Sequence, residues 1–363
     1  RGNSTYLVGE VVPMLPKKLS NGICSLVEGE DRLVKSVLFR FRDDGQLIGS
    51  KVAECVINSD KRLTNEQAIL FLRGNSLEAI KAAKPPPSRY SGNPGKSLQE
   101  VPMAELKVIN QTVQRLWAIA SKLRTARMKA GSLNLESAEV KILVDPSGEP
   151  EKIVTLENDE SHQLVEEFML LANESIAKQV KSKRMQGIFR VHPEPDPDHL
   201  EELRTFVKIF GISCGELTSR KEINKLLYNI NKHPLAQVLR IKFLRSMKQA
   251  CYRHNPDGHY GLAKRDYLHF TSPIRRYADL VVHRAVEKWL RKQKSQSENL
   301  EGLAKHLSVT ERNSVDAERE SVKDKLLLYY KRGIDHHPPI VHRAIITEIS
   351  RKGFFIELVD TMA

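Results

Sequence analysis

The stretch HFTSPIRRYADLVVHR, residues 269–284, constrains the fold most strongly because it predicts where a helix begins. Ser272 suits the N-cap position, and Pro273 suits the first helical position, where a backbone N–H would have no partner anyway. Apolar residues then recur on one face at helical spacing: Ile274, Ala278 and Val281. We therefore expect a helix that starts at Ser272 and packs one face against a core.

Two arginines, Arg275 and Arg276, fall in the first turn of this expected helix. The helix dipole favours anions there, so the placement is unfavourable unless a negative group binds. The free N–H groups of the first turn and the Arg275 guanidinium would together clamp a phosphate. The alternative is an intrahelical ion pair of Arg275 with Asp279, which stabilises a helix by only about 0.3 kcal/mol, and the pattern leaves both open. A metal site of His269, Asp279 and His283 is disfavoured because the spacing matches no standard ligand pattern.

Charge limits the classes of partner. The chain has 363 residues, with 58 Lys and Arg against 45 Asp and Glu and a formal net charge of +13. Such a charge favours a polyanionic partner, foremost a nucleic acid, and the alternative is a basic protein with a solvated surface. A DNA-binding regulator would rest on charge alone, because no recognition-helix module is present.

Hydropathy and cysteine usage indicate the compartment. No apolar run approaches the roughly 18 residues of a membrane span, so no membrane partner is expected. The four cysteines are far apart and form no CxxC pair. Both features are typical of a reduced, cytoplasmic protein.

Periodicity predicts both strands and helices. Residues 32–58 alternate in polarity around a turn at Gly45, as expected for a β-hairpin. Helical spacing marks several long stretches: 103–131, a second one capped by Ser161, and a charge-rich one at 303–330. Two further strands are expected after Val341. The mixture predicts an α+β fold, with a β-sheet core surrounded by helices.

Several stretches together resemble the ribonuclease II / ribonuclease R family, whose catalytic part is the RNB domain. The stretch at 269–284 leans towards the ribonuclease R branch. The others occur in family order: VVPMLPKKLSNGICSL (11–26), VEEFMLLANESIA (165–177), FRVHPEP (189–195), FLRSMKQA (243–250), HYGLA (259–263) and AERE (317–320). The resemblance implies an RNB domain with a mixed sheet over residues 1–340. It also implies the first strands of an OB-fold barrel over residues 341–363.

The resemblance also implies an activity. Members of the family are processive 3′→5′ exoribonucleases, monomeric and magnesium-dependent, which hydrolyse single-stranded RNA to nucleoside 5′-monophosphates. Phosphodiester hydrolysis needs metal ions at the attacking and leaving oxygens and a cation that neutralises the charge developing in the transition state. These needs suit the basic residues of this chain.

Site residues follow from the resemblance alone. Arg275 matches the catalytic arginine, and Arg276 beside it would contact RNA. Glu318 matches a glutamate near the active site, and Glu166 matches one near the terminal nucleotides. Tyr6 matches a tyrosine that stacks on bases at the 3′ end. Without the family, Glu318 suits a solvated helix face, Glu166 suits a helix dipole and Tyr6 suits a strand.

The chain departs from the family pattern at two RNA-binding positions. Leu135 stands where ribonuclease II has a phenylalanine, and it offers an apolar wall without π-stacking. Asn65 stands where many members have a tyrosine. We still expect both residues to contact RNA.

The family's magnesium-binding aspartates lie upstream of the segment that matches Tyr6, which here means upstream of Arg1. Only five residues precede Tyr6, beginning with Arg1, and none of them is acidic. We therefore expect no metal ligands in this chain, and we interpret it as a fragment of a longer enzyme. The alternative function is an RNA-binding relative without catalytic activity, because those aspartates are absent from it.

Overall fold

Helices and strands both contribute to the fold, so the predicted α+β class is confirmed. The computed structural model describes residues 1–83, 95–135, 139–156, 158–293, 299–336, 341–351 and 353–358. The last five residues of the expected barrel segment, 359–363, lie outside the described part.

The described helices and strands follow one another without internal repeats. The helices are α1 (Asn65–Leu72), α2 (Leu77–Lys81), α3 (Met103–Lys129), α4 (Glu160–Ser182), α5 (Pro197–Ile209), α6 (Arg220–Lys232), α7 (Ala236–Ser246), α8 (Tyr277–Leu290) and α9 (Leu300–His336), with the short turns η1 (Leu19–Ile23) and η2 (Leu98–Glu100). The strands are β1 (Thr5–Leu7), β2 (Glu10–Val12), β3 (Asp31–Phe41), β4 (Leu47–Asn58), β5 (Glu139–Val144), β6 (Pro150–Leu156), β7 (Phe189–Val191), β8 (Cys251–Arg253), β9 (Ala344–Ser350) and β10 (Gly353–Leu358). They pair as five antiparallel two-stranded sheets: β1–β2, β3–β4, β5–β6, β7–β8 and β9–β10.

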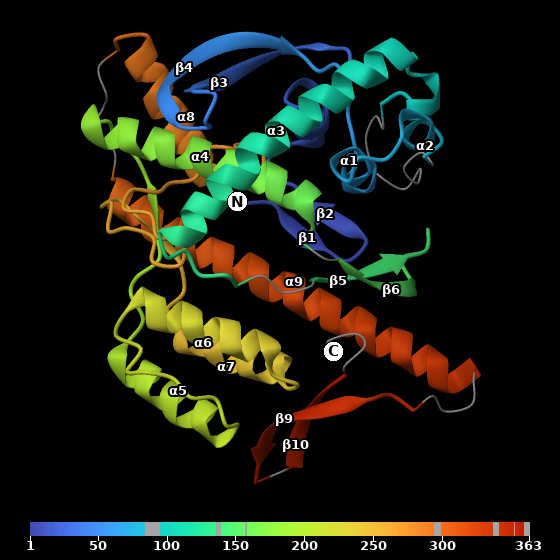
Figure 1. The fold of residues 1–363 in the computed structure, drawn as a ribbon, viewed down its shortest axis with the longest axis vertical. Coiled ribbons are helices and arrows are strands. Elements are labelled where there is room, and N and C mark those ends of the chain that lie inside the picture. Colours follow the sequence, from blue (N-terminus) through green and yellow to red (C-terminus); the bar gives the residue numbers. More distant parts are fainter. Residues whose placement is uncertain are drawn as a thin grey trace.

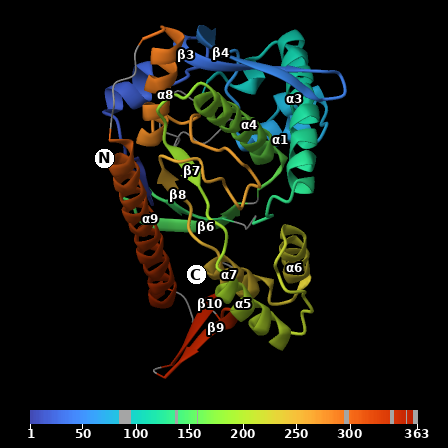
Figure 2. The same ribbon diagram turned by 90° about the vertical axis from the view of Figure 1, so that its left-hand side faces the viewer.

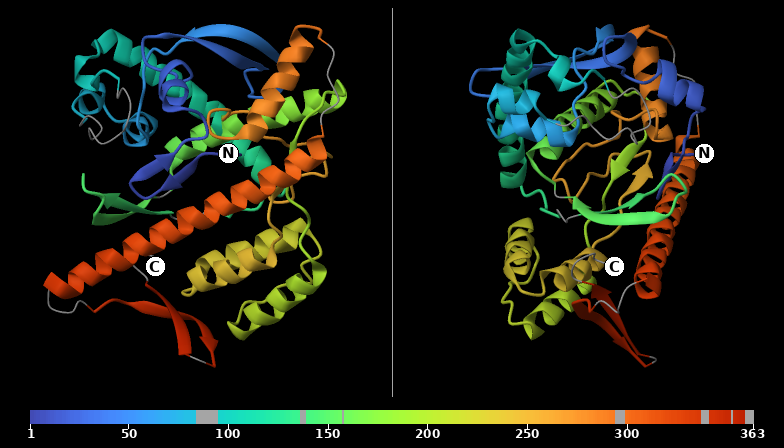
Figure 3. Two further views of the ribbon diagram at one scale, coloured as in Figure 1. Left: turned by 180° about the vertical axis from the view of Figure 1, so that it is seen from behind. Right: turned by 90° about the vertical axis from the view of Figure 1, so that its right-hand side faces the viewer.

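The long helix α9 organises the molecule. It runs across the structure, with the β1–β2 and β5–β6 pairs on one side and the helices α5, α6 and α7 on the other (Figures 1 and 3). Contacts join α9 to β1, β6 and β8. Viewed from the side, α9 forms one edge of the molecule, and the N-terminus lies near one of its ends (Figure 2).

The hairpin predicted at 32–58 is confirmed as β3 and β4. Its turn contains Gly45, whose φ of 88° is a conformation that glycine adopts without a steric penalty. One face of the hairpin is buried, since Val37 and Val52 pack into a core cluster with residues of α4 and α8. Alternation of side chains across a strand explains why the opposite face stays open to solvent.

Helix boundaries show where local signals suffice. The helix predicted to end near Gly131 is α3, which ends at Lys129, and Gly131 has a φ of 92°. The predicted cap at Ser161 is wrong, because Asp159 caps α4. The Asp159 carboxylate accepts hydrogen bonds from the backbone N–H groups of Ser161 and His162 at 3.0 and 3.3 Å. Asp159 and Ser161 are both residue types that cap helices, and residue type alone does not decide which of the two takes the N-cap position.

The predicted helix start at Ser272 is also wrong. Residues 273–275 form a turn, and α8 begins only at Tyr277. Arg276 is extended, with φ −134° and ψ 121°, because it forms an antiparallel bridge with Asn3. The N-terminal segment thus overrides the strong local signal of Ser272 and Pro273.

The sequence led us to expect no membrane-spanning helix and reduced cysteines. None of the described helices combines the length and apolar character that crossing a bilayer requires. The four cysteines carry free thiols: Cys24, Cys55, Cys214 and Cys251.

Candidate active site

The N-terminal segment is hydrogen-bonded to the arginine turn, residues 272–276. The Ser4 N–H donates to the Arg275 carbonyl, and the Tyr277 N–H donates to the Gly2 carbonyl, both at 2.9 Å. These bonds flank the bridge between Asn3 and Arg276. The Tyr277 amide at the start of α8 is therefore occupied by protein. A phosphate at this turn would depend on the Arg275 side chain rather than on that amide.

The same segment then runs along α9 through polar contacts. The Thr5 hydroxyl lies 2.9 Å from the Ser314 hydroxyl, and the Tyr6 N–H donates to Glu318 Oε1 at 2.7 Å. The Val8 N–H donates to the Ser321 hydroxyl at 2.9 Å. The helical residues in these contacts are spaced by four and three positions, so they share one face of α9.

Two hydrogen-bond series therefore bring Tyr6, Arg275 and Glu318 to one place. Tyr6 and Glu318 are separated by 312 positions in the sequence. The Tyr6 side chain is 46% exposed, which leaves its ring open to a planar group. Gly2 permits the close approach to α9, because a Cβ there would lie 2.2 Å from the Thr310 hydroxyl oxygen. The sequence predicted these residues for one site, and the structure brings them together.

Arg275 and Arg276 have opposite surroundings. The Arg275 side chain is exposed and forms no hydrogen bond or ion pair with the described residues. The Arg276 guanidinium is held by Asp279, with Nε to Oδ2 at 2.9 Å and Nη2 to Oδ1 at 2.8 Å. The intrahelical ion pair that we considered for Arg275 thus belongs to Arg276. The expected RNA contact of Arg276 stays a prediction, and its fork is already engaged.

Asp279 is the anchor of the turn. Its side chain is completely buried, and its Oδ1 also accepts the Ser272 N–H at 2.7 Å. One carboxylate therefore fixes both ends of the turn that presents Arg275. A buried carboxylate is stable only with such partners. The sequence analysis considered Asp279 as a partner of Arg275 and as part of a disfavoured metal site, but not as the anchor of the turn, because the start of the helix was placed too early.

A row of aromatic and imidazole side chains lies close to the turn. The Tyr252 hydroxyl lies 3.0 Å from His269 Nδ1, and the Arg190 guanidinium lies over the Tyr252 ring at 4.9 Å. Arg190 also pairs with Glu311 of α9 at 2.5 Å. Burial, followed by the charges of Arg276 and Arg190, lowers the pKa of His269 well below its usual value. His269 is therefore neutral at physiological pH and serves as a hydrogen-bonding group.

The packing interpretation of His283 agrees with the structure. His283 Nε2 lies 2.8 Å from the Phe270 carbonyl, and its ring stacks on the Phe270 ring with centroids 4.1 Å apart. Burial lowers the pKa of His283 as well. Its hydrogen bond and stacking hold the side chain in the fold.

Glu166 lies at the seam between α3 and α4. The buried Arg127 donates to Glu167 at 2.5 Å, to the Ser132 hydroxyl at 3.0 Å and to Glu166 at 3.4 Å. Glu167 is buried, whereas the Glu166 side chain is 37% exposed. The seam thus presents one carboxylate outward and holds the other inside.

Leu135 and Asn65 occupy two further places. Leu135 is partly buried against the core cluster of α5, α6 and α7. Asn65 begins α1, and its Nδ2 lies 2.8 Å from His162 Nε2 on α4. Among the described residues, neither side chain forms a hydrogen bond with Tyr6, Arg275 or Glu318. His162 was missed as the partner of Asn65, and no sequence spacing pointed to it.

Comparison with known families decides what this arrangement is. The RNB domain profile matches residues 1–292, about four fifths of the chain. The chain belongs to the RNB domain family. Ribonuclease R of Thermotoga maritima is 36% identical over 369 residues, which cover 99% of this chain and 48% of that protein. Ribonuclease R of Escherichia coli K12 is 31% identical, covering 99% of this chain and 43% of that protein.

Solved structures of other proteins share the fold. Mycoplasma genitalium RNase R in complex with ribose-methylated single-stranded RNA is 26% identical, with a TM-score of 0.83, and covers 100% of this chain and 54% of that one. Yeast Ssd1, a pseudonuclease, gives a TM-score of 0.68 at 18% identity, which shows a shared fold alone. The chain spans about half the length of the curated relatives that it matches.

Magnesium is the cofactor that the RNB resemblance implies. Across the described ranges, no three or more His, Cys, Asp or Glu side chains are grouped so that they would hold a metal ion. Two carboxylates of this region have other partners, since Glu318 accepts the Tyr6 N–H and Asp279 is buried and paired with Arg276. The described residues therefore do not by themselves form a magnesium site.

Arg1 is the first residue of the sequence, and the resemblance would place the metal side of the site upstream of it. Its guanidinium Nη1 donates to the Pro13 carbonyl at 2.9 Å, beyond the end of β2. Arg1 is exposed and offers a cation, which cannot act as a metal ligand. The expectation that the magnesium-binding aspartates lie upstream of Arg1 concerns residues outside this chain, so it stays a prediction.

Proposed function

We propose that this RNB chain is part of a processive 3′→5′ exoribonuclease that hydrolyses single-stranded RNA to nucleoside 5′-monophosphates. The observation that carries the proposal is the hydrogen-bonded N-terminal segment, which brings Tyr6, Arg275 and Glu318 to one place. Curated relatives named ribonuclease R support the reaction class.

Each residue has a role that its surroundings favour. The exposed Arg275 guanidinium pairs with the oxygens of the scissile phosphate and neutralises the charge that develops in the transition state. The exposed Tyr6 ring stacks on a base at the 3′ end, and stacking tolerates any base sequence. Glu318 holds the Tyr6 backbone in place.

The other proposed residues surround the RNA path. Glu166 faces the terminal nucleotides from the seam of α3 and α4, with its carboxylate oriented by Arg127. Leu135 supplies an apolar wall, and Asn65 supplies an amide where many family members have a ring. Arg276 acts on RNA chiefly through the turn that it stabilises, because its fork is bonded to Asp279.

The proposal includes Mg²⁺ as cofactor, held by aspartates upstream of Arg1, a cytoplasmic location, a monomeric state and no membrane partner. Residues 1–340 would form the RNB domain, and the β9–β10 hairpin would begin an OB-fold barrel within 341–363. Since the described residues do not complete a magnesium site, the test needs arms with and without Mg²⁺.

The test is an assay of this chain with 5′-labelled single-stranded RNA, in Mg²⁺ or in EDTA, beside the Arg275→Ala variant. A ladder that shortens to small end products in Mg²⁺ only, and is lost in the variant, supports the exoribonuclease. The matched control is Arg115→Ala, since Arg115 is an exposed arginine of α3 without a hydrogen bond to the described residues.

RNA binding is measured in the same samples. Binding without shortening in either arm is expected both if the magnesium-binding aspartates lie upstream of Arg1 and if the chain is the alternative, an RNA-binding RNB relative without catalytic activity. The same assay of a longer chain that includes the residues upstream of Arg1 separates the two. In either case Arg275→Ala should still reduce the salt dependence of binding by about one phosphate contact. A preference for duplex DNA over single-stranded RNA would reject both functions.

A further inference from the structure

A cavity of about 440 Å³ lies beside the loop 256–265, away from the hydrogen bonds that join Tyr6 to α9. This size falls within the roughly 300–1,000 Å³ typical of sites for small molecules. Ionisable and imidazole side chains dominate the lining: His192, Glu194, Arg220, His259, Lys264 and Arg265. No residue assigned to the proposed active site lines this cavity.

The uncompensated charge in the cavity is positive. Lys264 pairs with Glu174, which lies outside the lining, and Asp257 of the lining pairs with Arg253 outside it at 2.8 Å. Arg220, Arg265 and Glu194 then remain, and their charges sum to one positive unit. Two guanidinium groups of this kind favour a phosphate.

Arg220 is held in a fixed orientation. Its guanidinium lies over the Tyr260 ring at 4.0 Å, and its Nη1 donates to the Tyr260 carbonyl. Among the described residues, its remaining N–H groups have no acceptor. Arg265 is exposed at the rim and forms no ion pair in the described part of the chain. One cation is therefore preorganised and the other is free to adapt.

His259 adds a neutral hydrogen-bond donor. Burial and the nearby His192 and Arg190 lower the pKa of His259 to about 3, so its ring is neutral at physiological pH. Its Nδ1 accepts the Leu262 N–H at 3.3 Å, which places the proton on Nε2. His192 is already satisfied, because its Nδ1 accepts the Gly261 N–H at 2.9 Å and its Nε2 donates to the Lys248 carbonyl at 2.7 Å.

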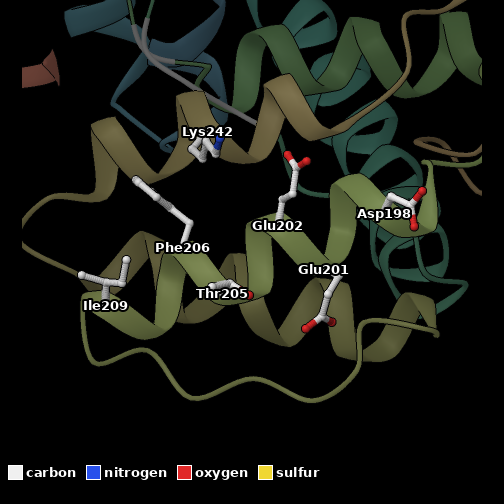
Figure 4. A pocket seen from close by; sticks show the side chains of 7 residues that line it. All are labelled: Asp198, Glu201, Glu202, Thr205, Phe206, Ile209 and Lys242. Atoms are coloured by element: carbon white, nitrogen blue, oxygen red, sulfur yellow. The ribbon is translucent and has the colours of Figure 1, made fainter. Parts of the chain in front are cut away.

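A larger groove on α5 and α7 has the opposite character. It is lined by Asp198, Glu201 and Glu202 with a single cation, Lys242, and it is shallow and open (Figure 4). Glu201 pairs with Arg204 at 2.9 Å, and Asp198, Glu202 and Lys242 together leave one uncompensated negative charge, which repels a phosphate. This contrast selects the loop cavity as the place for an anionic ligand.

The wall of the loop cavity is bonded to the seam that carries Glu166. The Gly261 carbonyl accepts the Leu133 N–H at 2.8 Å and the Ser132 hydroxyl at 3.3 Å. Ser132 in turn accepts from Arg127, the partner of Glu166. Three successive hydrogen bonds thus connect the cavity loop to Glu166, which is proposed to face the end of the RNA.

We propose that the loop cavity binds a nucleoside 5′-monophosphate, with its phosphate between Arg220 and Arg265. The choice of ligand rests on the proposed function, since this is the product class of that reaction. The cavity would receive the released product next to the site and separate it from the incoming RNA.

The test titrates this chain with adenosine 5′-monophosphate in EDTA and follows backbone amide shifts by NMR. Gly258 and Gly261 report on the cavity, and Gly2 and Gly9 report on the N-terminal strand. We expect saturable shifts at Gly258 and Gly261, weaker binding of inorganic phosphate, and no binding of adenosine. Shifts confined to Gly2 and Gly9, or no saturation, would overturn the proposal.

Charge reversal identifies the binding residues. Arg265→Glu should weaken binding by about tenfold or more, the loss of a charge-assisted contact. Arg115→Glu, the same charge change on the exposed face of α3, should change it by less than about twofold. Equal affinities in the two variants would overturn the proposal. Arg220→Lys keeps the charge without the planar fork, so it should weaken binding less than Arg265→Glu.

Failure of this inference is distinguishable from failure of the proposed function, because the binding test involves no turnover. If RNA is degraded normally but the nucleotide does not bind at Gly258 and Gly261, the proposal for the cavity alone is rejected. Nucleotide binding at those glycines in a chain that neither binds nor degrades single-stranded RNA rejects the exoribonuclease proposal and leaves the cavity proposal in place.

Discussion

Two pairs of neighbouring like charges, Arg275–Arg276 in the turn and Glu166–Glu167 on α4, are arranged alike. In each pair one residue is held by a buried partner of opposite charge, Arg276 by Asp279 and Glu167 by Arg127. The other residue of each pair faces outward. A charge that is removed from water needs a partner of opposite sign. The residue held by that partner fixes the backbone beside it, and this backbone presents the exposed residue of the pair.

The pairs differ in what the outward residue is free to do. Glu166 shares the Arg127 guanidinium at 3.4 Å, so its charge is partly compensated within the protein. Arg275 has no ion pair among the described residues. This difference supports our proposal that Arg275 of the turn contacts the phosphate directly and that the seam shapes the site around it.

The largest expected effect is a loss of stability when the buried partner of Glu167 at the seam is removed. Arg127→Met leaves Glu167 buried, and its remaining ion pair among the described residues is with Arg124 at 3.9 Å. We expect the free energy of unfolding to fall by about 3–5 kcal/mol, because a buried charge loses its main partner. Urea unfolding followed by circular dichroism measures it. Arg115→Met on the exposed face of the same helix is the matched control, and an equal loss there would contradict the comparison.

The second prediction repeats this test at the turn. Asp279→Asn keeps the shape of the anchor and removes its charge, so we expect a loss of about 2–3 kcal/mol in the free energy of unfolding. Arg275→Ala should change that quantity by less than about 0.5 kcal/mol, as for other exposed residues, while it weakens RNA binding. Urea unfolding and RNA titration of both variants give the result. A strongly destabilising Arg275→Ala would break the comparison.

Much of the fold could be predicted from local patterns. The β3–β4 hairpin followed from alternation and Gly45, and the end of α3 followed from Gly131. The start of α8 could not be predicted, because Ser272 and Pro273 are strong local signals and the N-terminal segment competes for the same backbone. Contacts between residues so far apart in the sequence leave no trace in the spacing of residues.

The candidate site divides in the same way. Arg275, Tyr6 and Glu318 were predicted by resemblance, and the structure explains their proximity through β1. The ion pair of Asp279 was weighed as an alternative for Arg275, and the structure forms it with Arg276, because the spacing suits both. The ion pair of Arg127 and Glu167 was missed, since two charges on separate helices look like solvated faces until the helices pack.

A third prediction uses pH to distinguish the turn from the seam. Burial lowers the pKa of four histidines in the folded protein: His192, His259, His269 and His283. The folded state then binds fewer protons than the unfolded one, so their stabilising contribution is complete above pH 6.5 and falls as the pH decreases. Between pH 6.5 and 5 the loss should be about 1.5 kcal/mol for each strongly shifted histidine.

Urea unfolding at pH 7 and pH 5 measures this loss. His269 lies close to the turn, where the charges of Arg276 and Arg190 hold its pKa down. His269→Gln should therefore reduce the pH dependence, whereas Arg127→Met at the seam should leave it unchanged. The reverse result would place the titrating groups at the seam and contradict the comparison.

The smallest expected effect concerns the bond that joins Tyr6 to α9. Glu318→Ala removes the acceptor of the Tyr6 N–H, and we expect local opening of β1 to become easier by about 1 kcal/mol. Glu318→Gln keeps an oxygen acceptor, so it should retain most of the bond. Hydrogen exchange of the Tyr6 amide should be about fivefold faster in the alanine variant and close to the original in the glutamine variant. If both variants exchange equally fast, the carboxylate charge rather than the hydrogen bond holds the strand, and β1 would resemble the residue of each pair that is held by a partner of opposite charge.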